Sequence, residues 1–353
     1  MISMLVAAAV GFFVAILLTP LAIRLLRERN VGQFIQEDVS GHLHKHGTPT
    51  MGGVVMIVAV VAAYLISHLS LWTQAEGFAF QVRPFTTGGF LVLFALGGMG
   101  LIGFFDDLRK VTRERNLGLS KRWKLGGQLA IAGLFAWGAV SSGVPTSIGL
   151  IRPTGIEHGP IFFFIWVLLM LTATANAVNI TDGLDGLASG SSALVFGAFM
   201  IISFWIFRHP EFYLLSEEIG SLELAGISAA LLGATLGFLW WNAAPAKVFM
   251  GDVGSQALGG AMAALALLTN THLLLVVLGG LFVVETLTVI MQVASFRIFD
   301  KRIFLMTPLH HHFELKGWPE TTVIVRFWVL AVICVALGLG LFYADSIVNG
   351  NIG

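Results

Sequence analysis

The chain has 353 residues, of which 56% are hydrophobic and only 11% are charged, and its mean hydropathy is +0.86. This composition excludes an ordinary soluble domain and predicts an integral membrane protein. The formal net charge is zero, and we expect no nucleic acid partner.

Apolar runs of nearly membrane-spanning length recur along the whole chain. They cover residues 5–23, 51–71, 88–105, 126–142, 161–178, 191–207, 224–241, 254–269, 273–296 and 327–343. A helix needs about 20 residues to cross a bilayer. The first run is not a secretory signal, because no basic residue precedes it and Arg24 and Arg27 follow it. We therefore expect an all-α, polytopic bundle of about ten transmembrane helices, in a single integral membrane domain over residues 1–353.

Basic residues separate onto alternate loops between these runs. One set of loops carries 17 of them, and the other set carries only Arg83, Arg152 and Arg208. The positive-inside rule places the basic loops in the cytoplasm and both termini outside. A basic cytoplasmic face suits anionic lipid headgroups or a phosphorylated substrate. The single cysteine, Cys334, supports neither a disulfide framework nor a thiolate metal site.

The first basic loop ends in HLHKHGTPTMGG, residues 42–53. Pro49 and the neighbouring threonines suit the start of a helix. Lys45 stands among three histidines, and it is either a phosphate-binding cation or part of a solvated basic edge.

The second loop begins with GFFDDLRK, where Asp106 and Asp107 leave a span and are followed by Lys110 and Lys124. Adjacent residues on a helix point about 100° apart, so we expect one aspartate to face a reaction and the other a lysine. The alternative is a helix end that forms salt bridges with its own basic loop.

The third loop reads NAVNITDGLDGLA, residues 176–188. Asp182 and Asp185 would share one face of a helix, while Gly183 and Gly186 allow close ligand approach. The stretch suits a phosphorylated ligand, or it is an Asp-Gly turn between two helices.

The fourth loop, residues 240–260, places Asp252 between Gly251 and Gly254 at the start of a span, near Asn242. A carboxylate and free backbone amides at a helix N-terminus can hold a cation and phosphate oxygens together. Phe249 could stack on a base or lie as an aromatic residue at the membrane interface.

The segment 272–299 stays apolar for longer than a perpendicular span requires, so it should tilt or bend. Gly279 and Gly280 mark the expected bend, although small residues also serve close packing. Glu285 in this segment is either a buried packing partner or a proton relay.

The fifth loop carries PLHHHFE, residues 308–314. Neighbouring histidines diverge, and zinc sites usually space their ligands, so we expect His310, His311 and His312 to bind carbohydrate or phosphate. Together the five loops supply aspartates for a hard cation, and lysines and histidines for anions. Phosphoryl transfer requires that combination.

The chain resembles the phospho-N-acetylmuramoyl-pentapeptide transferase family of bacterial wall synthesis, within the polyprenyl-phosphate N-acetylhexosamine-1-phosphate transferases. The motifs HKHGTPTMGG, GFFDDLRK with GLSKRWKL, NAVNITDGLDGLA, PAKVFMGDVGS and RIFLMTPLHHHFELKGW carry the resemblance, in the family's order and over essentially the whole chain. The chain departs from the family's common residues at His46, Leu108 and Gln256.

The resemblance implies transfer of phospho-MurNAc-pentapeptide from UDP-MurNAc-pentapeptide to undecaprenyl phosphate in the bacterial plasma membrane, with Mg²⁺, giving lipid I and UMP. It implies that Asp252 is the Mg²⁺ ligand, that Asp106 is the base or the partner of the lipid phosphate, and that Asp107 is its companion in catalysis. It also implies a substrate site lined by Lys45, Lys124, Asn179, Asp182, Asp185, Asn242, Phe249, His310, His311 and His312. The bilayer and a second copy of the chain are further candidate partners.

The sequence leaves open the reaction mechanism and two alternative functions. Residue types do not decide between direct attack by the lipid phosphate and a covalent aspartyl intermediate. A related enzyme could use UDP-N-acetylglucosamine, although the histidine loop argues against it. The chain could also be a transporter. Transporters, however, place ionisable groups near mid-membrane, whereas the ionisable residues of this chain cluster in loops.

Overall fold

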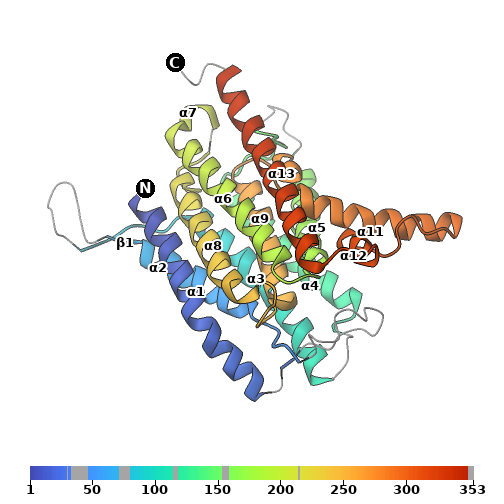
Figure 1. Cartoon of the computed structure of the whole chain (residues 1–353). Helices are drawn as coiled ribbons and strands as arrows, with labels where there is room; N and C mark the ends of the chain where they lie inside the picture. The colour runs from blue at the N-terminus through green and yellow to red at the C-terminus, as the bar shows by residue number, and fades with distance from the viewer. Residues whose placement is uncertain are drawn as a thin grey trace.

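The computed structural model describes residues 1–29, 31–32, 47–70, 80–113, 118–152, 159–213 and 215–348. The helices are α1 (Ile2–Glu28), α2 (Gly53–Ser67), α3 (Thr87–Thr112), α4 (Lys121–Ser141), α5 (Gly159–Thr181), α6 (Leu187–Arg208), α7 (Pro210–Tyr213), α8 (Ser221–Asn242), α9 (Gly251–Leu268), α10 (Leu274–Leu278), α11 (Gly280–Phe299), α12 (Leu309–Leu315) and α13 (Glu320–Val348). Two short strands, β1 (Leu69–Ser70) and β2 (Gln81–Val82), pair antiparallel beside the bundle (Figure 1).

Each of the ten apolar runs overlaps a helix, and α2 covers residues 53–67 of the second run. Seven helices of the described chain are both long and apolar enough to cross a membrane: α1, α3, α5, α6, α8, α11 and α13. α2 is apolar but has only 15 residues. The prediction of an all-α, multi-pass membrane protein is therefore confirmed, whereas length and hydropathy alone support seven spans rather than ten.

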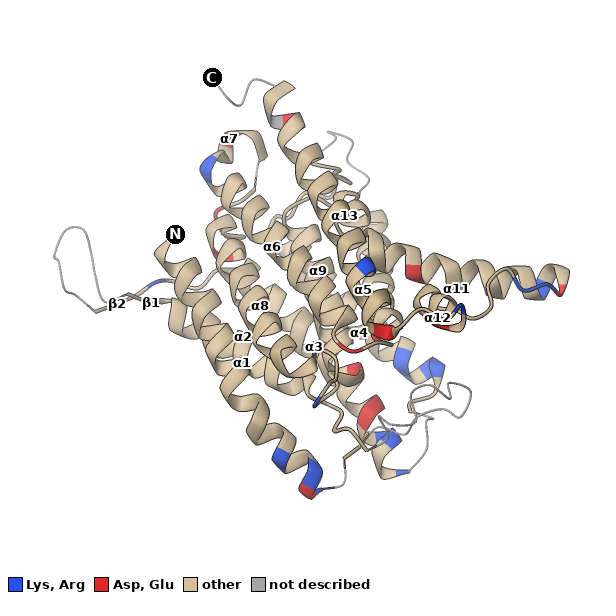
Figure 2. Ribbon diagram, in the orientation of Figure 1, with Lys and Arg blue, Asp and Glu red and all other residues tan. Residues whose placement is uncertain are grey.

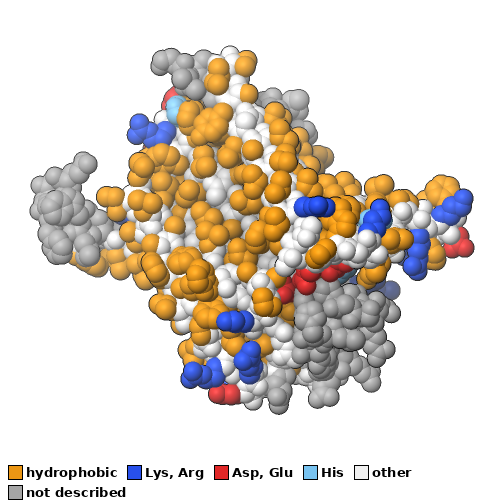
Figure 3. Space-filling model, viewed as in Figure 1, with side chains coloured by type: hydrophobic (Ala, Val, Ile, Leu, Met, Phe, Trp, Pro, Cys, Tyr) orange, Lys and Arg blue, Asp and Glu red, His pale blue; other side chains and the backbone are white. Residues whose placement is uncertain are grey.

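α9 is the central helix of the bundle, and the neighbours that pack against it include α2, α3, α5 and α6 (Figure 1). Every residue from Val253 to Leu268 is buried. A helix that is apolar on all sides belongs in the interior. The outer helices instead expose apolar side chains over the sides of the bundle, as expected for contact with lipid (Figure 3).

Small residues allow α1 and α8 to pack closely. The buried face of α1 repeats every three or four residues, as one face of a helix does, and it includes Gly11 and Ala15. A Cβ atom on Gly233 of α8 would overlap the carbonyl oxygen of Ala8, and one on Gly237 would overlap that of Phe12. Glycine at these positions brings two backbones together in a way that larger residues prevent.

The apolar segment after α9 is broken at the predicted glycine pair. α10 ends at Leu278, and α11 begins at Gly280 and leaves the bundle sideways as a projecting arm (Figure 1). A Cβ atom on Gly280 would lie 2.7 Å from Sγ of Cys334 on α13, so this glycine also serves close packing. The bend is confirmed. A hollow of about 330 Å³ lies beside the far half of the arm, lined by Gln292, Val293, Phe296, Arg297, Arg302, Leu305, Met306 and Thr307.

Charged residues gather at the lower end of the bundle and along the arm (Figure 2). The first residues of α1 and the last residues of α13 lie toward the opposite, upper side (Figure 1). Both chain ends therefore lie away from the charged end of the bundle.

We predict that Gly233→Ala destabilises the bundle, because the added methyl group meets the backbone of α1 and cannot be relieved by a side-chain movement. Overpacking of this kind costs about 1–3 kcal/mol. Gly226→Ala on the same helix is the matched control, since a Cβ there meets no atom within 4 Å. Thermal unfolding in detergent should show a lower Tm for Gly233→Ala and an unchanged or higher Tm for Gly226→Ala. Equal Tm values for the two variants would contradict the packing argument.

Candidate active site

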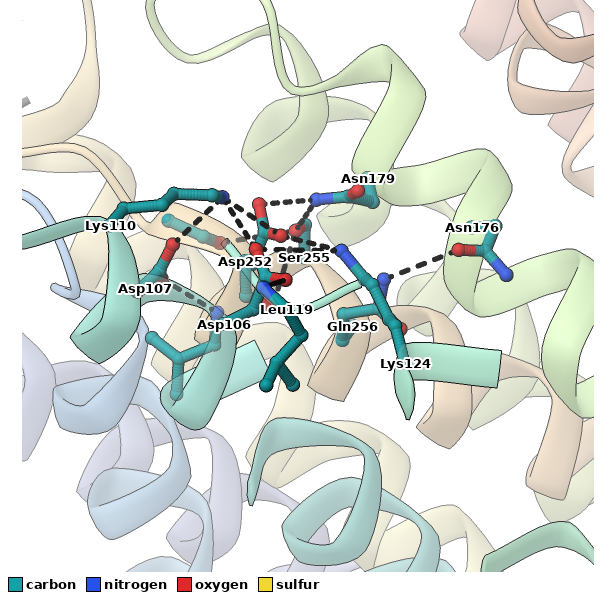
Figure 4. A network of polar contacts seen from close by, with 12 residues as sticks. Asp106, Asp107, Lys110, Leu119, Lys124, Asn176, Asn179, Asp252, Ser255 and Gln256 are labelled. Atoms are coloured by element: carbon teal, nitrogen blue, oxygen red, sulfur yellow. Dashed lines mark hydrogen bonds and ion pairs between the residues drawn. The ribbon is translucent and has the colours of Figure 1, made fainter. Parts of the chain in front are cut away.

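Four helix ends meet at the lower end of the bundle. The last turns of α3 carry Asp106 and Asp107, and the first turn of α4 carries Lys124. Asn179 lies in the last turn of α5, and Asp252 in the first turn of α9. The ends of α3, α5 and α9 are far apart in the sequence, whereas α4 closely follows α3, and the polar side chains of all four segments point toward one another (Figure 4).

The two adjacent aspartates are both buried, and each binds a different backbone amide. Oδ1 of Asp106 accepts a hydrogen bond from the amide of Leu119 at 2.9 Å, which holds the start of the α4 segment against α3. Oδ2 of Asp107 accepts one from the amide of Val253 at 3.1 Å, in the first turn of α9. A carboxylate at a helix N-terminus also meets the positive end of the helix dipole.

Lys110 lies among all three carboxylates. Its Nζ is 2.8 Å from Asp106 Oδ2, 3.3 Å from Asp107 Oδ1 and 3.0 Å from Asp252 Oδ2. The expectation that only one aspartate would face a lysine is therefore wrong. Lys110 follows Asp106 by four residues and Asp107 by three, and both spacings bring side chains together on a helix.

Asp252 receives hydrogen bonds from two other helices. Lys124 Nζ donates to its Oδ2 at 2.6 Å, and Asn179 Nδ2 donates to its Oδ1 at 2.9 Å (Figure 4). Asn179 Nδ2 also lies 2.9 Å from Ser255 Oγ, one turn further along α9. Lys124 and Asn179, both predicted site residues, thus fix the orientation of the predicted metal ligand.

Asp106, Asp107 and Asp252 could hold a divalent cation. Each offers a carboxylate oxygen, and the three oxygens lie within 4.8 Å of one another. Mg²⁺ and Ca²⁺ prefer oxygen ligands of this type. The ammonium groups of Lys110 and Lys124 within the same cluster supply further positive charge for phosphate oxygens.

Asp182 follows α5 directly and lies partly buried near this cluster. Burial, together with the negative charges of Asp252, Asp107 and Asp185, raises the pKa of Asp182 well above its usual range. The position is therefore one where a positive group or a shared proton is favourable.

Asp185 and Asn242 are buried, and they shape the fourth loop. Oδ2 of Asp185 accepts from the amide of Ala246 at 2.8 Å. Nδ2 of Asn242 donates to the carbonyl of Val248 at 2.9 Å, and its Oδ1 accepts from Ser189 Oγ at 2.7 Å. These two predicted binding residues brace residues 246–248 rather than join the carboxylate cluster.

Phe249 is partly buried, and its backbone is paired on both sides with the segment before α2. Its amide donates to the carbonyl of Pro49 at 2.8 Å, and its carbonyl accepts from the amide of Gly52 at 2.9 Å. The first and fourth loops therefore meet at the backbone of this residue.

Glu285, on the arm, holds the first histidine of the predicted triplet. Its Oε1 lies 3.1 Å from Nδ1 of His310, its Oε2 accepts from the amide of Leu309 at 2.6 Å, and both side chains are fully buried. Nε2 of His310 lies directly against Gly183, where a Cβ atom would overlap it. This nitrogen has no hydrogen-bond partner among the described residues. The sequence allows Glu285 to be either a buried packing partner or a proton relay, and these contacts match the packing partner.

The other two histidines point to separate partners. Nδ1 of His311 lies 2.7 Å from Oε2 of Glu314, and Nδ1 of His312 accepts from the amide of Leu305 at 3.1 Å. The three imidazoles therefore have different partners, but the rings of His310 and His311 are in edge-to-face contact with their centroids 4.2 Å apart, so the expectation that neighbouring histidines diverge is wrong for this pair. Lys45 lies outside the described residues.

The chain is similar to one family model and to proteins of several bacteria. The sequence model of the family described as Glycosyl transferase family 4 matches residues 89–270. A protein of Frankia casuarinae is 50% identical over 365 residues, covering 99% of each chain. Proteins of Streptomyces coelicolor (46% over 363 residues, 97% of this chain and 98% of the relative) and Beutenbergia cavernae (44% over 373 residues, 99% and 100%) are also similar. All three relatives are named phospho-N-acetylmuramoyl-pentapeptide-transferase.

We predict that Glu285→Ala lowers stability strongly, because it leaves the Leu309 amide and the buried imidazole of His310 without an acceptor. Each unsatisfied buried group costs about 1–3 kcal/mol. Glu314→Ala is the control, since the side chains of Glu314 and its partner His311 are partly exposed, by 16% and 15%, whereas those of Glu285 and His310 are fully buried. Thermal unfolding should show the larger Tm decrease for Glu285→Ala, and a larger decrease for Glu314→Ala would refute this account.

Proposed function

The chain belongs to the phospho-N-acetylmuramoyl-pentapeptide transferase family, and from this premise we propose which of its residues carry the reaction. It is a phospho-sugar transferase of peptidoglycan precursor synthesis in a multi-pass membrane protein. The substrate pair that we propose is UDP-MurNAc-pentapeptide and undecaprenyl phosphate, with lipid I and UMP as products.

One observation carries the residue assignment. Asp106, Asp107 and Asp252 bring their carboxylates within 4.8 Å of one another, and two lysine ammonium groups reach into the same cluster. Phosphoryl transfer between two phosphorylated substrates requires cations that neutralise phosphate oxygens and a group that handles the nucleophile.

We propose Mg²⁺ as the divalent cation, with Asp252 as its principal ligand and Asp106 and Asp107 beside it. When bound, the ion would neutralise the pyrophosphate oxygens of the nucleotide substrate. Lys124 and Asn179 keep the Asp252 carboxylate in one orientation through their hydrogen bonds at 2.6 and 2.9 Å.

Asp106 is the proposed base or hydrogen-bond partner of the lipid phosphate. The amide of Leu119 fixes its Oδ1, and its Oδ2 lies 2.8 Å from Nζ of Lys110, on the side of the cluster where the two lysines would hold the lipid phosphate. Lys110 and Lys124 then attract the phosphate groups of both substrates. Asp107 binds the start of α9, and this contact suits a role in holding the cluster together.

The nucleotide and sugar-peptide parts are proposed to contact the surrounding loops. Phe249 offers a face for the uracil ring, on a loop that Asp185 and Asn242 hold in place. Asp182 and the triplet His310, His311 and His312 border the same region. Lys45 remains a proposed phosphate contact.

We further propose a plasma-membrane location in which the basic loops and the active site face the cytoplasm and both termini lie outside. Residues 1–353 would then form a single transferase domain, with a homodimer as one assembly that the sequence permits. The arm α11 is exposed and apolar, and we infer that it borders the path by which the lipid chain approaches.

A second candidate is a transferase that uses UDP-N-acetylglucosamine. The buried placement of His310 over Gly183 supports the first candidate, because it makes the histidine loop part of the site. A transporter is disfavoured, since the ionisable cluster lies at one end of the bundle (Figure 2).

We expect Asp252→Asn to lower turnover by at least about 100-fold, because the amide keeps the shape but loses the charge that binds the cation. The assay uses purified protein in detergent with undecaprenyl phosphate, and wild-type protein should accept UDP-MurNAc-pentapeptide but not UDP-N-acetylglucosamine. Asp300→Asn, at an exposed position at the end of α11, is the control. Near wild-type turnover by Asp252→Asn at limiting Mg²⁺ would remove Asp252 as the metal ligand.

We expect Asp106→Asn to lower kcat by about 100- to 1,000-fold with little change in KM for the nucleotide substrate, as loss of a proton-handling group does. Steady-state kinetics with each substrate varied in turn measure both constants. A variant with altered KM and normal kcat would make Asp106 a binding residue instead.

A further inference from the structure

Three amide side chains form a closed ring of hydrogen bonds in the interior of the bundle. Gln128 Nε2 donates to Gln256 Oε1 at 2.6 Å, Gln256 Nε2 donates to Asn176 Oδ1 at 3.5 Å, and Asn176 Nδ2 donates to Gln128 Oε1 at 3.0 Å. Gln128 Nε2 also lies within hydrogen-bond distance of Asn176 Oδ1, at 3.3 Å, so each of the three amides bonds to both of the others. Gln128 and Gln256 expose only 1% and 0% of their surface.

The ring belongs to the three helices that orient the predicted metal ligand, and it lies one turn deeper. Gln128 follows Lys124 by four residues on α4, Asn176 precedes Asn179 by three on α5, and Gln256 follows Asp252 by four on α9. Residues three or four apart share one face of a helix. The ring therefore repeats, one turn below, the contacts that Lys124 and Asn179 make with Asp252 (Figure 4).

The ring constrains how each helix is rotated about its own axis. Turning any of the three helices by one residue swings its amide by about 100° and breaks two of the three contacts. The amides would then be buried without partners, which is costly in an apolar bundle. Asn176 Nδ2 also donates to the carbonyl of Thr172 at 2.8 Å, which ties its side chain to α5 itself.

We propose that Gln128, Asn176 and Gln256 are positioning residues that set the rotation of α4, α5 and α9, and so hold Lys124 and Asn179 against Asp252. None of the three touches the reacting groups. The proposal rests on the proposed function, because it assigns Asp252 as a cation ligand whose geometry the ring maintains. Partners that orient a metal ligand typically change metal affinity by about 10- to 100-fold when they are removed.

The test is direct binding of Mn²⁺, used alone as a paramagnetic substitute for Mg²⁺, to purified protein without substrate. Gln256→Met and Gln128→Met keep side-chain length and remove the amide. We expect each to raise the Kd for Mn²⁺ by about tenfold or more. The double variant Gln128→Met/Gln256→Met should bind Mn²⁺ no more weakly than the single variant with the higher Kd, because either substitution alone already opens the ring.

Gln128→Asn gives a second route to the same result, since it keeps an amide but shortens its reach by one carbon and introduces no apolar group. It too should weaken Mn²⁺ binding. Gln292→Met is the matched control, because the Gln292 amide also makes three hydrogen bonds, two of them partly buried and one exposed, but with the backbone of residues 303 and 304 after α11. Its Kd for Mn²⁺ should equal that of the wild type.

Thermal unfolding of each variant separates positioning from a purely structural role. A lower Tm with a Kd within twofold of the wild-type value, for both Gln256→Met and Gln128→Asn, would overturn the proposal. If Asp252→Asn lost Mn²⁺ binding and the ring variants did not, the positioning role of the ring would be refuted, and the proposed function would stand. Undiminished binding in Asp252→Asn would instead refute the assignment on which the proposal rests.

Discussion

The charged end of the helix bundle depends on the neutralisation of three carboxylates whose oxygens lie within 4.8 Å of one another. Asp106, Asp107 and Asp252 would repel one another strongly at the edge of an apolar bundle. Lys110 reaches all three, and Lys124 adds a second positive charge at Asp252. These ion pairs form only if α3, α4 and α9 meet at this point. The charged side chains therefore stabilise this arrangement of the three helices.

Close backbone contact makes that meeting possible. A Cβ atom on Gly103 would overlap the carbonyl oxygen of Asp252, so α3 lies directly against the first turn of α9. Gly53 and Gly254 form a similar contact between α2 and α9. Larger residues at these positions would hold the helices further apart. The carboxylate of Asp107 on α3 could then not reach the α9 amide of Val253, from which it accepts a hydrogen bond.

The projecting arm is joined to the same end of the bundle by another buried pair. Glu285 holds His310, and His310 lies over Gly183 in the loop that follows α5. The arm, α12 and the Asp182 loop are therefore positioned together. A displacement of α11 would therefore move His310 against the Asp182 loop, so the apolar arm and this polar loop are mechanically coupled.

The sequence by itself determined the class of protein, the approximate positions of the apolar helices and the aspartates that are candidates for the site, and it marked Gly279 and Gly280 as either a bend or a close contact. These features follow from hydropathy, from loop charge and from short motifs, which depend on residues that are close together in the chain. Only the tertiary structure decided which helices are neighbours. Asp185 and Asn242 proved to brace a loop, Lys110 proved to bridge all three carboxylates, and Gln128 proved to pair with Gln256 across 128 positions. Helical periodicity shows which face of a helix is apolar or polar, but it does not specify the partner of that face, because the partner is set by packing between distant segments.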